Sequence, residues 1–309
     1  MVAKNTVRIV GNDGVAKLEP AANEALRFLD WAVLCTNVYA VGVTKRLTGH
    51  KWEEWISRKK RIPLPPTWSR CNEAEEFIDD HKNPGALNKM VMEVWRYDDP
   101  GQPERIVLVY RGTANLIEWV SNLNWFIGRR LPFLVDKFKE LGGLLDALIP
   151  HITQCYPNAQ LVAAGHSLGG GLAQFSAYRC DRIKLVYAFN PSPVTGFYSV
   201  PKERRRHNKS DVVIYRVYNR GEALAIMRGP IKFLRNRVRR FFKPKPHAVQ
   251  IFEYGFRFEW GNPLTLHGSG RLAWYLAGSV TTQATLEGRA AGTPGTIGNA
   301  FDSAGQAGI

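Results

Sequence analysis

Short apolar runs alternate along the chain with stretches of helical periodicity. Each run is bounded by turn residues, which predicts buried strands at 105–112, 159–164, 184–190, 212–219 and 249–260. Apolar residues recur at helical spacing at about 21–42, 72–82, 134–155, 168–179 and 267–278. Strands that alternate with helices in this way predict an α/β fold, with a mostly parallel central sheet flanked by helices on both faces.

Two further patterns complete the predicted organisation. Residues 89–97 and 105–112 are separated by a turn sequence, which predicts a β-hairpin, and a short strand is predicted at the TVRIV stretch near the N-terminus. The 309 residues are 45% hydrophobic, enough for a sizeable core. We expect a single domain over residues 1–280 and a flexible Gly/Ala-rich tail over 281–309.

The stretch VAAGHSLGGGLAQ, residues 162–174, joins a predicted strand to a predicted helix and contains Gly165-x-Ser167-x-Gly169. A serine at such a tight turn is a candidate nucleophile, because the turn lifts its hydroxyl above the sheet edge. The next N–H, that of Leu168, lies at a helix N-terminus and is a candidate oxyanion donor. The motif by itself also fits an ordinary glycine-rich turn, so the hypothesis depends on partners further along the chain.

The candidate partners follow from the rule that reactive groups gather at the carboxyl ends of parallel strands. Asp181 and Asp211 precede predicted strands, whereas Glu222 follows the 212–219 strand and is the candidate acid. A solvated or arginine-paired carboxylate is the alternative for Glu222. Chain order and strand edge exclude five of the seven histidines as the base, namely His50, His81, His151, His207 and His247. His166 is excluded because it lies inside the serine turn and points away from the place where a base must sit.

His267 remains, because it follows the 249–260 strand by a short loop and begins a helix. The order Ser167, Glu222, His267 is nucleophile, acid and base. Thr113, at the end of the 105–112 strand, is a second candidate oxyanion donor, a role compatible with that of a helix N-cap.

Several of these segments together resemble the class 3, or fungal-type, lipase family. The resemblance rests on VYRGT, LIEWVSNL, CYPNAQLVAAGHSLGGGLA, RVYNRGEALA and the helix with His267 and Trp274-Tyr275, and it covers roughly residues 20–280. It implies an α/β-hydrolase fold and Ser–Asp–His ester hydrolysis without a cofactor, here on acylglycerols or phospholipids. Glu222 departs from the family, which usually has aspartate at this place. FNPSP at 189–193 replaces the usual Gly-Ser-Pro.

The net charge of +15 is concentrated in one segment. Residues 202–245 hold 15 of the Lys and Arg residues and three acidic ones, and we treat this segment as a basic insert. Within it, PIKFLRNRVRRFF at 230–242 has the spacing of an amphipathic helix, whose basic residues include Lys232, Arg235, Arg239 and Arg240. Such a helix fits an anionic membrane surface and equally a helix packed on the core; specific nucleic-acid binding is not expected. The 124–133 stretch fits either a lid or a packed loop.

Other features limit the remaining function classes. The four cysteines are widely spaced, and no His-Glu-x-x-His occurs, so the sequence predicts neither a zinc site nor a metal cofactor. The first residues lack the apolar stretch of a secretory signal, and no stretch predicts a membrane span, so we expect a cytoplasmic location or export without a leader. Two functional alternatives stay open: a soluble carboxylesterase of the feruloyl type, and a non-catalytic membrane- or nucleic-acid-binding protein on a hydrolase scaffold.

Overall fold

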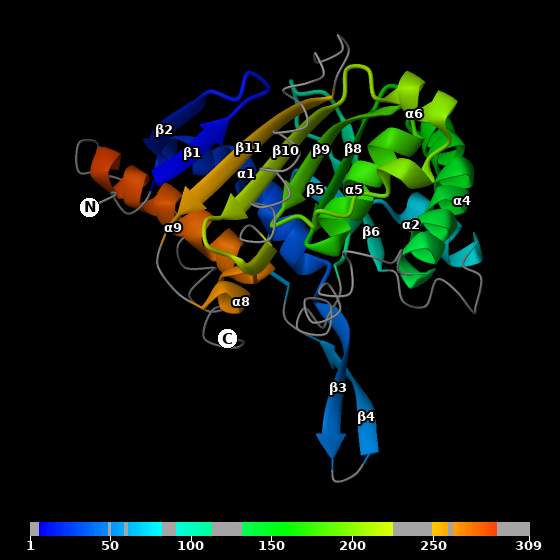
Figure 1. Ribbon diagram of the computed structural model, residues 1–309, viewed down its shortest axis with the longest axis horizontal. Coiled ribbons are helices and arrows are strands. Elements are labelled where there is room, and N and C mark those ends of the chain that lie inside the picture. The colour runs from blue at the N-terminus through cyan, green and yellow to red at the C-terminus, as the bar shows by residue number, and fades with distance from the viewer. Residues whose placement is uncertain are drawn as a thin grey trace, which may run out of the picture.

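The computed structural model describes residues 6–48, 51–58, 61–81, 91–112, 132–224, 249–258 and 262–288. Its main feature is a sheet of nine strands in the order β2-β1-β11-β10-β9-β8-β7-β6-β5 (Figure 1). The five strands in the middle run parallel to one another: β7 (Arg105–Tyr110), β8 (Gln160–His166), β9 (Ile183–Phe189), β10 (Val213–Asn219) and β11 (Gln250–Arg257). The predicted α/β fold with a parallel centre is confirmed.

Helices cover both faces of this sheet. The chain steps from β7 to β10 in one direction through α4 (Pro132–Cys155), α5 (Leu168–Arg179) and α6 (Lys202–Asn208). Because crossover connections have one hand, such stepwise crossovers put their helices on one face. α1 (Ala21–Asn37) and α9 (Ser269–Gly288), which contact each other, cover the opposite face.

The two faces carry separate cores, which the alternation of β8 makes visible. Leu161 and Ala163 pack with the residues of α4 and α5, whereas Val162 and Ala164 pack with those of α1 and α9. Successive side chains of a strand point to opposite faces, so His166 continues the series of Val162 and Ala164. This parity directs His166 toward α1 and α9.

Antiparallel strands close both edges of the sheet. β6 (Met92–Tyr97) pairs with β7, as the predicted hairpin required, and β5 (Trp68–Arg70) pairs with β6 beside α2 (Asn72–His81). At the other edge β1 (Thr6–Val10) pairs with β11 and β2 (Ala16–Pro20) with β1. Segments at the two ends of the sequence thus share one edge of the sheet.

The predicted helix over 21–42 ends at Asn37, five residues early. The chain then forms a second, two-stranded sheet, β3 (Val41–Thr48) and β4 (Lys51–Arg58), which projects from the body of the molecule (Figure 1). The end of α1 is held to the strand-like segment after the hairpin, because Asn37 donates to Ile62 O and accepts from Ile62 N, both at 2.8 Å. The Asn37 side chain therefore bonds both the N–H and the C=O of Ile62, which fixes the chain after the helix end.

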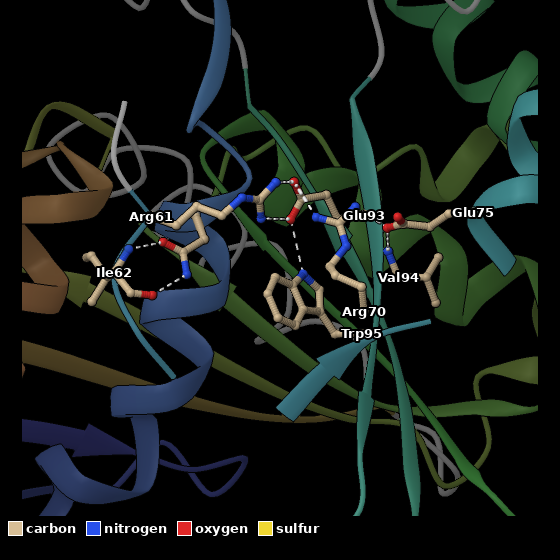
Figure 2. Close-up of polar contacts among 8 residues, drawn as sticks. Arg61, Ile62, Arg70, Glu75, Glu93, Val94 and Trp95 are labelled. Carbon is tan, nitrogen blue, oxygen red and sulfur yellow. Dashed lines mark hydrogen bonds and ion pairs between the residues drawn. The ribbon is translucent and has the colours of Figure 1, made fainter. Parts of the chain in front are cut away.

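Glu93 on β6 anchors the same segment. Figure 2 shows Arg61, Arg70 and Trp95 around the Glu93 carboxylate. Arg61 donates two hydrogen bonds to it, at 2.7 and 3.1 Å, Arg70 approaches to 2.8 Å and the Trp95 indole donates at 3.1 Å. A carboxylate that is nearly buried needs such partners, so the site fixes residues 61–70 against the sheet.

The structure describes part of the basic insert and part of the predicted tail. Residues 202–224 of the basic insert include α6 and the whole of β10, so this part of the segment belongs to the body of the fold. α8 (Pro263–Leu266) precedes α9, and α9 continues to Gly288, past the predicted start of the tail at 281. Among the described helices, none combines the length and apolarity that crossing a bilayer requires.

Candidate active site

Ser167 occupies the turn between β8 and α5. It has φ 59° and ψ −124°, a conformation that costs a residue with a side chain of the order of 1–3 kcal/mol. Three backbone hydrogen bonds hold it there: Ser167 N–H donates to Phe189 O at 3.0 Å, and Ser167 O accepts from Ser192 N–H at 2.9 Å and from Gly170 N–H at 3.0 Å. The strained serine is thus tied to the end of β9, and the predicted strand–turn–helix context is present.

The glycines of the motif are needed for close backbone approach. A Cβ at Gly165 would collide with the carbonyl group of Gly169, and a Cβ at Gly169 would collide with the Tyr110 carbonyl at the end of β7. A Cβ at Gly112 would meet the Ser167 side chain and the His166 carbonyl. The turn after β7 therefore runs directly against the serine turn.

Glu222 and His267 meet at the carboxyl ends of the parallel strands. Glu222 follows β10 and is fully buried, and His267 precedes α9 and is 2% exposed. Their contact is 2.6 Å, from His267 Nδ1 to Glu222 Oε2. The same oxygen accepts the Leu224 N–H at 2.8 Å, so two donors orient the carboxylate.

This contact defines the tautomer of His267. A carboxylate only accepts, so Nδ1 carries the proton and Nε2 is the basic nitrogen of the neutral ring. His267 Nε2 is buried and has no hydrogen-bond partner among the described residues. The arrangement leaves one ring nitrogen available for proton transfer, with the other nitrogen fixed by the acid.

His166 also lies beside His267, with ring centroids 4.8 Å apart. Its Nε2 lies 2.7 Å from the His267 carbonyl oxygen, and its Nδ1 lies 3.1 Å from the Tyr39 hydroxyl. Sequence reasoning excluded His166 as a base and gave it no other part. The alternation of β8 is the signal that would have directed it to the α1–α9 face.

The structure describes one of the two candidate oxyanion donors, Leu168. Leu168 begins α5, and its N–H is among the first-turn groups that find no acceptor within a helix. Thr113 lies outside the described residues, although Gly112 before it is placed against Ser167. Residues 124–131 of the 124–133 stretch also lie outside them, whereas its last two residues begin α4. The 230–242 stretch, with Lys232, Arg235, Arg239 and Arg240, lies outside them as a whole.

No three His, Cys, Asp or Glu side chains among the described residues converge as a metal site requires. The described cysteines are free thiols.

One family model and several solved structures are similar to this chain. The model of the class 3 lipase family matches residues 107–221, from β7 to the turn before Glu222. No curated protein matches the sequence. Similar solved structures include a Rhizopus microsporus var. chinensis lipase, with 12% identity over 86% of this chain and 88% of that one and a TM-score of 0.44. Lipase II of Rhizopus niveus has 14% identity over 78% of this chain and 86% of that one, with a TM-score of 0.42. The nonglycosylated LIP2 lipase of Yarrowia lipolytica is also similar, with 15% identity over 66% of this chain and 74% of that one and a TM-score of 0.41.

Proposed function

We propose that this chain, whose residues 107–221 belong to the class 3 lipase family, is a serine carboxylic ester hydrolase of the lipase type. The observation that carries the proposal is the 2.6 Å contact between Glu222 and His267, both buried, at the sheet edge where Ser167 stands. A catalytic triad requires an acid that fixes one imidazole nitrogen and a second nitrogen open to the serine hydroxyl. Glu222 fixes His267 Nδ1, and His267 Nε2 has no other partner among the described residues.

The first half of the reaction forms an acyl-enzyme. His267 Nε2 takes the proton of Ser167 Oγ, and Oγ forms a bond to the ester carbonyl carbon. The bond from that carbon to the alkoxy oxygen then breaks, and His267 returns the proton to the leaving alcohol. Glu222 stays ionised and stabilises the imidazolium that forms between the two steps.

Water completes the reaction by the reverse sequence. His267 removes a proton from water, the hydroxide attacks the acyl carbon, and Ser167 Oγ leaves with the returned proton. In both halves the carbonyl oxygen becomes negative, and we assign its stabilisation to the N–H of Leu168 and to Thr113. Removal of one such donor typically costs about 2.7–4 kcal/mol of transition-state stabilisation.

Glutamate in place of the family's usual aspartate is accommodated by the turn that carries it. Gly221 has φ 94°, a left-handed conformation that favours glycine, and Glu222 N–H donates to Asn219 O at 3.2 Å. This tight turn starts the longer side chain close behind the end of β10. The additional methylene then brings the carboxylate to His267 Nδ1.

Acylglycerol or phospholipid esters are the proposed substrates, on the strength of the family match. The test is hydrolysis of p-nitrophenyl esters from acetate to palmitate, with and without anionic vesicles, by the wild type and by Ser167→Ala. Activity that requires Ser167 and rises with acyl length or vesicles supports the proposal. Activity confined to short esters would contradict the lipase proposal and favour a soluble carboxylesterase.

A further inference from the structure

His166 lies in an enclosed polar position between three elements. It is the last residue of β8 and faces α1 and α9, so it meets Tyr39 just after α1 and His267 just before α9. Its side chain is 5% exposed. Both ring nitrogens have partners there, which is the condition for placing a histidine in a core.

The direction of each hydrogen bond follows from the acceptors. The His267 carbonyl can only accept, so His166 Nε2 carries a proton and donates to it. Burial, helped by the nearby His267, lowers the pKa of His166 to about 3, so its Nδ1 is an unprotonated acceptor near neutral pH. The Tyr39 hydroxyl therefore donates to Nδ1, and its oxygen accepts the Gly112 N–H at 2.8 Å.

These bonds connect both sides of the serine turn. One end is Gly112, whose backbone runs against Ser167 and leads to Thr113. The other end is the backbone of His267, whose ring contacts Glu222. The Tyr39 phenol and the His166 imidazole thus connect Gly112, at the end of β7, to the backbone of the proposed base.

The carbonyl of His267 has a second donor. Asn190 Nδ2 lies 2.9 Å from it, and Asn190 Oδ1 accepts the Asn219 N–H at 3.0 Å. Asn190 itself has φ 40°, in the left-handed region that asparagine tolerates better than most residues. The start of α9 is therefore attached to the ends of β8, β9 and β10.

We propose that Tyr39 and His166 are positioning residues, a hydrogen-bonded pair that sets the distance between the His267 backbone and the Gly112 strand end. This inference rests on the proposed triad. The pair is not proposed to touch the substrate, so its loss displaces the base and the Gly112 strand end without removing either. A displacement of about 1 Å costs on the order of a hundredfold in rate.

Tyr39→Phe and His166→Leu remove the pair's hydrogen bonds and leave bulk in place. We expect each to lower kcat for the best p-nitrophenyl ester by about 10- to 100-fold, with KM within about twofold. His166→Gln can donate and accept at similar places, so it should recover part of the loss. The double variant should be no slower than His166→Leu, because both changes break one unit.

Tyr110→Phe is the matched control. Tyr110 is a fully buried tyrosine that accepts a hydrogen bond from Ser176 at 2.8 Å, on the α5 side of the sheet. It should lower the melting temperature as Tyr39→Phe does and leave kcat unchanged. Equal kcat in Tyr39→Phe and Tyr110→Phe, with an active wild type, would overturn the positioning role.

A spectroscopic measurement decides the question without turnover. In protein labelled with ¹⁵N in its histidines, His166 should give the signals of a neutral ring protonated at Nε2 at pH 7. The downfield Nδ1–H proton of His267, which reports its bond to Glu222, should shift or broaden in Tyr39→Phe and stay unchanged in Tyr110→Phe. A charged or Nδ1-protonated His166, or an unchanged His267 proton in Tyr39→Phe, overturns the inference. Absence of Ser167-dependent hydrolysis in the wild type would instead overturn the proposed function.

Discussion

His267 donates its Nδ1–H to Glu222 over 2.6 Å, and the Glu222 oxygen that accepts it is also held by the Leu224 N–H. The two residues are 45 positions apart in the chain, and each follows the end of a parallel strand, β10 or β11. Neither side chain can exchange this partner for water, because both are buried. The pair therefore sets one tautomer and one orientation of the imidazole.

Glu222→Gln should remove the charge and allow the wrong tautomer of His267. We expect kcat to fall by about 10⁴-fold, as when the acid of a serine triad is replaced by its amide. Steady-state kinetics on p-nitrophenyl esters measures this. KM should change little, since the carboxylate does not touch the substrate.

Glu222→Asp keeps the charge and is the matched variant. It restores the family's usual acid but on a shorter side chain, so it should retain more activity than Glu222→Gln. Equal, nearly full activity of both variants would mean that the acid lies elsewhere.

The collision at Gly165 predicts a large loss of stability. An added methyl meets the backbone of Gly169, which cannot move without displacing Ser167, so Gly165→Ala should lower the free energy of unfolding by about 3 kcal/mol. Gly143→Ala is the control. Gly143 lies within α4, where a Cβ would meet nothing within 4 Å, and alanine there should stabilise by about 0.5–1 kcal/mol. Urea unfolding that gave both variants the same sign would contradict this account.

Stability should depend on pH through His166. Its pKa is lowered from 6.5 to about 3 by burial, so between these values the unfolded chain binds a proton that the folded chain does not. The stability contributed by the neutral ring is present above pH 6.5 and is lost as the pH falls toward 3. The slope from one proton is about 1.4 kcal/mol per pH unit. Urea unfolding at pH 5, 6 and 7 measures how the free energy of unfolding changes with pH. This dependence should be weaker in His166→Gln than in the wild type, and an equal dependence in both proteins would contradict the prediction.

Glu93 predicts a stability effect far from the serine. Glu93→Gln leaves Arg61 and Arg70 facing a neutral group, and we expect a loss of about 2 kcal/mol, less than for a wholly buried pair because both arginines are partly exposed. Asp98→Asn, which breaks an exposed pair with Arg96, should change the free energy of unfolding by under about 1 kcal/mol. Equal losses in the two variants would show that the Glu93 cluster is no stronger than a surface pair.

Local sequence was sufficient for the parts of the fold that depend on near neighbours. The apolar runs and turns located β7 to β11, and the strand-edge rule selected Glu222 and His267, which the structure brings into contact. The rule works because parallel strands share one carboxyl edge. The roles of these residues, of Leu168 and of Thr113 remain proposals.

Pairings between segments far apart in the sequence could not be predicted from local patterns. β1 pairs with β11 across about the whole chain, and no local pattern shows this partner. The β3–β4 hairpin was missed, because its strands carry charged residues on both sides of the turn and pair only with each other. His166 was excluded as the base by its place inside the serine turn, an argument that identifies the base but not the groups that hold it.

The most direct test of the central claim is labelling of Ser167 with a fluorophosphonate, followed by peptide mass spectrometry, in the wild type and in His267→Gln. The account predicts one adduct per chain, on Ser167, formed at least about a thousandfold faster in the wild type. Ser167→Ala should take up no label at this peptide. An adduct elsewhere, or equal rates with and without His267, would contradict the proposed triad.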